Sequence, residues 1–185
     1  MRKKVIASSL FLLTTAALCF SQDKSDQQYK LLATTRTSTM QKEIDQTSAQ
    51  GYRILVGAPT SGSEMVLFLS RDGTVADPYK YRLLATSRTG TMQKELADAA
   101  DAGFRLIPST MMSKKEFMGG EEIVLIMERP PKATNYYEYK LLATTRTSTL
   151  QKEVTDAKNA GFAIVGMVNR DENIVVMERS RPMTP

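Results

Sequence analysis

The stretch YKLLATTRTSTMQKE, which starts at Tyr29, decides the fold of this 185-residue chain, because nearly the same sequence occurs twice more. The second copy, YRLLATSRTGTMQKE, starts at Tyr81, and the third, YKLLATTRTSTLQKE, starts at Tyr139. Each copy runs on to a Gly followed by an aromatic residue and ends in an apolar run closed by Arg. Such self-similarity is the signature of a repeat architecture. The chain is therefore divided into a first segment (29–71), a second segment (81–129) and a third segment (139–179).

The first half of each segment predicts a strand followed by a helix. Residues 29–34 form a short apolar stretch, which is typical of a strand. Met40 and Ile44 then recur at helical spacing. Ser38 is expected to cap this helix, with Gln41 three residues later completing a capping box.

The second half predicts the end of the helix and a hairpin. Gly51, Gly103 and Gly161 stand where a helix ends with a left-handed residue. Two apolar runs follow in each segment, for example residues 52–56 and 65–69. Each segment is therefore expected to be a β-α-β-β unit whose last two strands form a hairpin.

The size of the segments indicates that they share a core. They contain 43, 49 and 41 residues, and below about 70 residues a core without disulfides or metal is marginal. Every side chain of residues 65–69 is apolar, so one face of this strand must meet something other than its own helix. We expect one compact α+β domain, in which three tandem β-α-β-β repeats are related by pseudo-threefold symmetry.

Short motifs in the chain resemble those of a small bacterial domain family, domain of unknown function 4177. The matching stretches are Tyr137-Glu138-Tyr139-Lys140, Gly161-Phe162 and Met127-Glu128-Arg129-Pro130. The resemblance touches all three segments, implies a β-α-β-β unit and carries no activity. Where that family usually has Trp after the Gly, this chain has Tyr52, Phe104 or Phe162.

The beginning of the chain predicts export. Three basic residues at 2–4 precede an uncharged, mostly apolar run at 5–20, a pattern typical of a secretory signal peptide. The run is shorter than the roughly 20 residues that span a bilayer. We expect residues 1–21 to be a signal peptide, leaving a periplasmic or secreted protein without a membrane span. A lipid anchor on Cys19 and an uncleaved N-terminal anchor are the alternatives. Residues 22–28 are then a linker, and residues 180–185 a C-terminal tail.

The composition disfavours several function classes. The chain has no His and one Cys, so it lacks the usual general base and the usual zinc ligand. It contains no phosphate-binding loop and no dinucleotide fingerprint. We therefore expect no enzyme, no cofactor and no metal site. Removal of residues 1–21 leaves 22 Lys and Arg against 20 Asp and Glu, a nearly neutral balance that gives no support for a nucleic-acid partner.

The repeated helix starts are candidate anion-binding sites. Free N–H groups at a helix N-terminus favour phosphate, sulfate or carboxylate, and Arg adds a planar fork that matches such anions. In the alternative interpretation the hydroxyls cap the helices, and the arginines are solvated or pair with Glu43, Glu95 and Glu153. The candidate residues are Arg36, Thr37 and Thr39, then Arg88, Thr89 and Thr91, then Arg146, Thr147 and Thr149.

The middle segment carries a Met-rich insertion that is a candidate interaction loop. Its apolar residues are Met111, Met112, Phe117 and Met118. Met-rich surfaces adapt readily to partners. The alternative is a loop that folds onto the core.

Together these patterns predict an exported, non-enzymatic binding or protein-interaction module whose partner is an unknown protein or anionic ligand. A structural envelope component without a small ligand and an enzyme-associated subunit are the alternatives. The repeated arginines discriminate between these hypotheses: convergence on one concave pocket favours ligand binding, whereas three separate exposed positions favour a scaffold.

Overall fold

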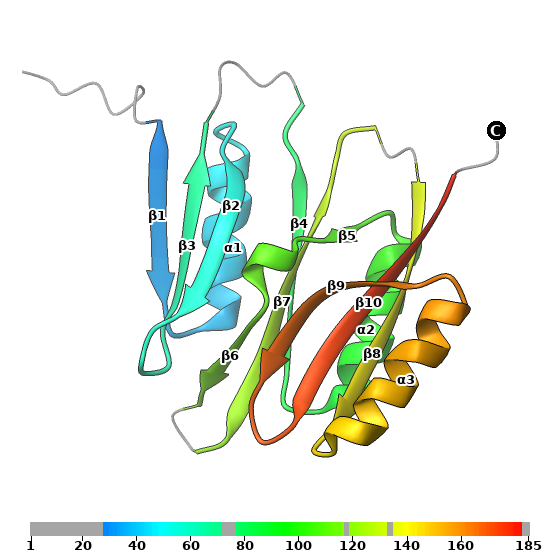
Figure 1. Cartoon of the computed structure of the whole chain (residues 1–185). Helices are drawn as coiled ribbons and strands as arrows, with labels where there is room; N and C mark the ends of the chain where they lie inside the picture. Colours follow the sequence, from blue (N-terminus) through cyan, green and yellow to red (C-terminus); the bar gives the residue numbers. More distant parts are fainter. Residues whose placement is uncertain (1–27, 72–76, 117–118, 133–134, 183–185) are drawn as a thin grey trace, which may run out of the picture.

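The computed structural model describes residues 28–71, 77–116, 119–132 and 135–182. These residues form three α-helices and ten strands in three antiparallel sheets, which confirms the predicted α+β class. The sheets lie in a row along the molecule (Figure 1). The predicted signal peptide and all but the last residue of the predicted linker lie outside the described residues. No helix in the described ranges is long and apolar enough to cross a membrane.

The first segment has the expected order of elements. Strand β3 lies at the centre of its sheet and pairs with β1 on one side and β2 on the other. The predicted hairpin is therefore confirmed here as β2 and β3. The elements are β1 (Tyr29–Thr34), α1 (Thr37–Ser48), β2 (Arg53–Pro59) and β3 (Met65–Ser70).

The third segment has the same strand arrangement, with β10 between β8 and β9. Its two longest strands exceed the expected boundaries, because residues 180–182 pair with residues 135–137. Part of the expected C-terminal tail is therefore sheet. The elements are β8 (Asn135–Thr144), α3 (Thr147–Asn159), β9 (Ala163–Asn169) and β10 (Asn173–Pro182).

The second segment departs from this plan after its helix. Pro108 begins a short 3-10 turn, and a proline cannot donate to a strand ladder. The hairpin strand is thus divided into two short strands, β5 and β6, which both pair with β7. The elements are β4 (Lys80–Thr86), α2 (Thr89–Asp101), β5 (Arg105–Leu106), η2 (Pro108–Thr110), β6 (Met112–Lys115) and β7 (Glu121–Arg129).

The ends of the helices match the sequence pattern better than their beginnings do. Gly51, Gly103 and Gly161 have φ values of 86°, 81° and 88°, so the predicted left-handed termini are confirmed. The predicted cap at Ser38 is wrong, because Ser38 lies inside the first turn of α1 and the N-cap position is Arg36. The Thr34 hydroxyl accepts a hydrogen bond from the Arg36 N–H instead, at 3.3 Å.

The segments are joined through shared apolar cores. Met40 and Ile44 of α1 pack in one cluster with Val124 and Ile126 of β7. Met92 and Leu96 of α2 pack in the next cluster with Ile174 and Val176 of β10. The second and third sheets thus bury one face against their own helix and the other against the preceding segment.

This serial packing corrects the expected pseudo-threefold arrangement. None of the core clusters formed by the described residues joins the first segment to the third. The outer face of the first sheet therefore lies at one end of the row and helix α3 at the other (Figure 1). The second and third sheets do bury a face against another segment, as expected, but that segment is only the preceding one.

A glutamine at each junction fastens a helix to the following strand. The Gln41 carbonyl oxygen accepts from the Leu83 N–H at 2.7 Å, and its amide donates to the Tyr81 carbonyl at 3.2 Å. Gln93 repeats both bonds with Leu141 at 2.7 Å and Tyr139 at 3.0 Å. Strands β4 and β8 lie at sheet edges, so these side chains satisfy backbone groups that face outward. The predicted capping role of Gln41 is therefore replaced by a bond between segments.

Replacing Gln41 or Gln93 by Ala is expected to lower the free energy of unfolding by about 1 to 2 kcal/mol each, because two backbone groups lose their partners. Gln151 provides the matched control, since among the described residues its amide donates only to Thr155 of its own helix. Gln151→Ala should leave stability unchanged. Chemical denaturation monitored by far-UV circular dichroism measures all three variants, and equal effects at the three positions would contradict the junction role.

Candidate functional site

The three repeated arginines occupy separate positions. Arg36, Arg88 and Arg146 are the N-cap residues of α1, α2 and α3, and all three are exposed. The helices begin at the same edge of the molecule, the lower edge in Figure 1. Among the described residues none of these guanidinium groups forms an ion pair, so pairing with Glu43, Glu95 or Glu153 is not observed. Their separation matches the arrangement that favours a scaffold.

The threonines of the same motif differ in their surroundings. Thr37 and Thr39 of α1 are partly buried, as is Thr89 of α2. Thr91, Thr147 and Thr149 are exposed. No side chain caps any of the three helix starts. The hydroxyls therefore do not take the capping role that the alternative interpretation assigned to them.

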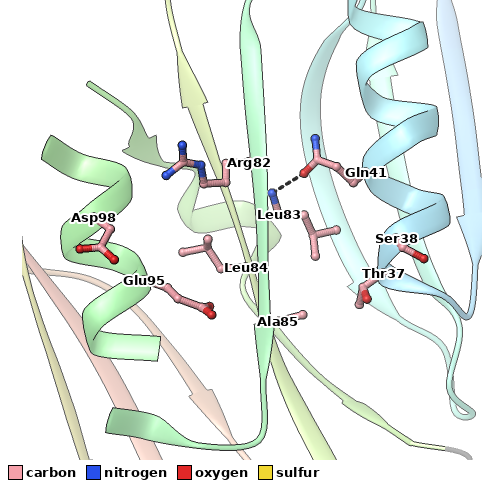
Figure 2. Close-up of a pocket in the computed structure, with 9 residues that line it drawn as sticks. All are labelled: Thr37, Ser38, Gln41, Arg82, Leu83, Leu84, Ala85, Glu95 and Asp98. Carbon is pink, nitrogen blue, oxygen red and sulfur yellow. Dashed lines mark hydrogen bonds between the residues drawn. The ribbon is translucent and has the colours of Figure 1, made fainter. Parts of the chain in front are cut away.

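An open groove of about 450 Å³ lies between α1, strand β4 and α2 (Figure 2). It includes one predicted site residue, Thr37, and none of the three N-cap arginines. Sequence reasoning missed its other polar residues, although Gln41 is repeated in all three segments and Glu95 and Asp98 lie one helical turn apart. The lining residues are Thr37, Ser38, Gln41, Arg82, Leu83, Leu84, Ala85, Glu95 and Asp98.

The charges of this groove do not resemble an anion site. Figure 2 shows Arg82 on β4 and the carboxylates of Glu95 and Asp98 on α2 around the same space. The Arg82 guanidinium lies 4.8 Å from the centre of the Phe104 ring, a cation–π contact that already holds it. Gln41 is bound to β4 through both atoms of its amide. Two carboxylates and one guanidinium favour a cationic or neutral polar group over phosphate.

The described residues offer little to a metal ion. They contain no group of three His, Cys, Asp or Glu side chains placed to hold one. The groove itself has only two carboxylates, fewer than the ligands that Ca²⁺ takes in proteins.

A second polar assembly lies at the junctions between segments. Arg53 of the first segment contacts Glu128 of the second at 2.7 Å, and Arg105 of the second contacts Glu178 of the third at 2.9 Å. The Tyr139 hydroxyl donates to the Glu178 carboxylate at 2.8 Å and accepts from the Leu106 N–H at 2.8 Å. The sequence contains a signal for these ion pairs. An Arg directly follows the Gly-aromatic pair only in the first two segments, and in each case the next segment carries a Glu near its end.

Burial raises the pKa of the Tyr139 phenol. Desolvation, followed by the negative charge of Glu178, raises its pKa well above the ordinary value near 10. The hydroxyl therefore remains a donor to Glu178. This bond keeps the buried carboxylate satisfied beside Arg105.

The Met-rich insertion is partly packed between the segments. Met112 on β6 is buried in the core shared with the first segment. Met111 packs against Gly166 of β9 so closely that a Cβ there would lie 2.3 Å from its sulfur. Both side chains therefore contribute to packing, and Phe117 and Met118 lie outside the described residues.

No family model, curated protein or solved structure matches the chain. The interpretation of its surfaces therefore follows from the geometry.

The anion hypothesis predicts that phosphate or sulfate raises the melting temperature of the parent and that replacing Arg36, Arg88 and Arg146 by Gln removes this effect. The fold should survive, because the three side chains are exposed and form no ion pair with other described residues. Thermal melts at several salt concentrations measure it, with Lys42→Gln as a control for the loss of charge. If neither anion stabilises the parent, the arginines bind no such ligand.

The raised pKa of Tyr139 predicts that the folded chain loses stability at alkaline pH. Its raised folded-state pKa means that the unfolded chain releases the proton first, so the free energy of unfolding falls as pH rises above about 10. Tyr139→Phe should make this fall shallower and should cost about 1 to 3 kcal/mol at pH 7, because Leu106 and Glu178 lose a partner. Denaturation between pH 7 and 11 measures both effects. Tyr136→Phe, at an exposed position, should change neither.

Proposed function

We propose that the chain is an exported, non-enzymatic protein-interaction module built from three copies of one β-α-β-β unit stacked in a row. Equivalent contacts in the three segments support the repetition. In each, the ring of the aromatic residue after the Gly contacts a cation of the first strand and the Arg that closes the apolar run of the last strand. The sets are Lys30, Tyr52 and Arg71, then Arg82, Phe104 and Arg129, then Lys140, Phe162 and Arg179.

The same contacts support the resemblance to domain of unknown function 4177. They involve the Gly-aromatic pair and the terminal Arg, which are the motif positions on which that resemblance depends. Each aromatic ring contributes by cation–π attraction. We propose that each segment is one such unit.

The interaction function depends on one observation, an apolar face of the first sheet that no other described residues cover. We call it the open sheet face and define it by Tyr29 and Leu31 of β1, Val56 of β2 and Phe68 of β3. Leu31 and Val56 are both register partners of Phe68, so the three side chains form one row across the sheet. All four residues are exposed.

In the second and third sheets, the equivalent face is covered by the preceding segment. Ile126 of β7 and Val176 of β10 occupy the position of Phe68 in their strands, and both are buried against the preceding segment. A continuous apolar patch on a sheet, next to the unpaired edge of β1, is a surface suited to a protein partner. The separate positions of the three arginines also favour a protein scaffold over a binder of a small anion.

Replacing Leu31 and Phe68 together by Ser should abolish most of the fluorescence of the apolar probe 1-anilinonaphthalene-8-sulfonate in dilute protein. The melting temperature should change little, because both side chains are exposed in the isolated chain. Ile126→Ser is the matched comparison, and it should destabilise the fold by about 2 to 5 kcal/mol, because it empties a packed core.

Two outcomes would contradict the proposal. Unchanged probe fluorescence in the double variant would show that the open sheet face is not an accessible apolar surface. A loss of stability as large as that of Ile126→Ser would show that Leu31 and Phe68 belong to a core.

A further inference from the structure

The two ends of the row carry the two halves of the junction that the structure forms twice inside the chain. One half is the open sheet face. The other lies on the third segment, and we call it the open helix face: Leu150, Gln151 and Val154 of α3 with Ile164 and Met167 of β9. These residues occupy positions that meet the following segment in the first two segments. No following segment covers them in the described structure.

The apolar residues of the two open faces are equivalent to residues that pack together at the internal junctions. Ile54 and Leu106 are buried, at 4% and 2% exposure, in clusters that include residues of the following segment, whereas Ile164 at the same position is 56% exposed. At the other end Phe68 is 48% exposed, whereas Ile126 is 1% exposed in the cluster that contains Ile54. Ile164 is thus equivalent to Ile54, and Phe68 is equivalent to Ile126. Ile54 and Ile126 lie in one buried cluster at the first internal junction.

The polar halves also correspond. Gln151 is exposed, although Gln41 and Gln93 at its position bind the next edge strand. The backbone groups that it would reach are the Leu31 N–H and the Tyr29 carbonyl, because Leu83 and Tyr81 supply them at the first junction. Strand β1 lies at the edge of its sheet, as β4 and β8 do.

The charged pair of the internal junctions is absent at both ends together. Ala163 replaces Arg53 and Arg105, and Ser70 replaces Glu128 and Glu178. Loss of only one partner would leave a buried charge uncompensated when the two faces meet. The joint replacement removes both members of the pair, so neither face carries an uncompensated charge at these two positions when the faces meet.

We propose that the open sheet face binds the open helix face of a second copy of this chain, so that copies associate head to tail. This inference rests on the proposed function and names the partner of its surface. The interface is heterologous, and its repetition continues the internal row from copy to copy. In it, Gln151 binds β1 of the next copy, and Ile164 and Met167 pack on Leu31 and Phe68.

One residue limits the strength of this contact. Lys158 stands at the position of Ser48 and Ala100, which are both buried at the internal junctions. A lysine there must direct its ammonium group to water along its aliphatic stem. The contact between copies is therefore weaker than the internal junctions and depends on protein concentration.

Sedimentation velocity of the full chain tests the proposal. The parent should show a mass that rises with concentration beyond that of a dimer. Leu31→Glu and Ile164→Glu should each be monomeric, because each places a charge on one face, and both should fold, since both residues are exposed. Lys158→Ala should associate at lower concentration than the parent.

A mixture of the two monomeric variants gives the decisive result. Leu31→Glu retains an intact open helix face and Ile164→Glu retains an intact open sheet face, so an equal mixture should form dimers and stop there. A parent that stays monomeric, a mixture that stays monomeric, or an unchanged association of Lys158→Ala would each overturn the proposal. Monomeric parent protein that still binds the apolar probe through Leu31 and Phe68 would overturn only the head-to-tail contact and leave the proposed function standing.

Discussion

Burial of both faces of a sheet is the constraint on which the rest of this structure depends. The strands β7 and β10 carry apolar side chains in both directions, so their own helices can cover only half of each strand. The preceding segment covers the other half. Units of fewer than 50 residues thereby share cores that none of them encloses alone. The row of segments, the glutamine bonds at edge strands and the uncovered ends all follow from this arrangement.

Polar contacts give the row its register. Apolar packing is not directional and would tolerate sliding of one segment over the next. The two bonds of Gln41 fix α1 to a single position along β4, and Gln93 does the same on β8. Arg53 and Arg105 then pair with Glu128 and Glu178 across the same junctions. A register error would separate these charges as well as the glutamine bonds, so both contacts select the same alignment.

Local features of the fold were predictable because they depend on neighbours in the sequence. The spacing of Met40 and Ile44 predicts the helix, and Gly51 predicts its end. The role of Gln41 was not predictable, since a glutamine three residues after Ser38 matches a capping box equally well. Choosing between the two roles requires the position of β4, which is set by the apolar face of another segment. The row differs from the predicted threefold arrangement for the same reason: an apolar face indicates that a partner exists but not which segment supplies it.

The candidate surfaces also differ in whether the sequence alone could identify them. Repetition of the motif points to the exposed arginines. Repetition alone, however, does not distinguish a functional residue from a residue kept by duplication. Burial makes this distinction when equivalent positions are compared along the row. Ile54 and Leu106 are buried and Ile164 is exposed, although all three are aliphatic. Ala163 and Ser70 instead differ from their internal counterparts in the loss of a charge. The ends thus lack the charges of the junction and retain its apolar side chains and its glutamine, a combination that suits burial better than exposure to water, because water favours charged side chains over apolar ones.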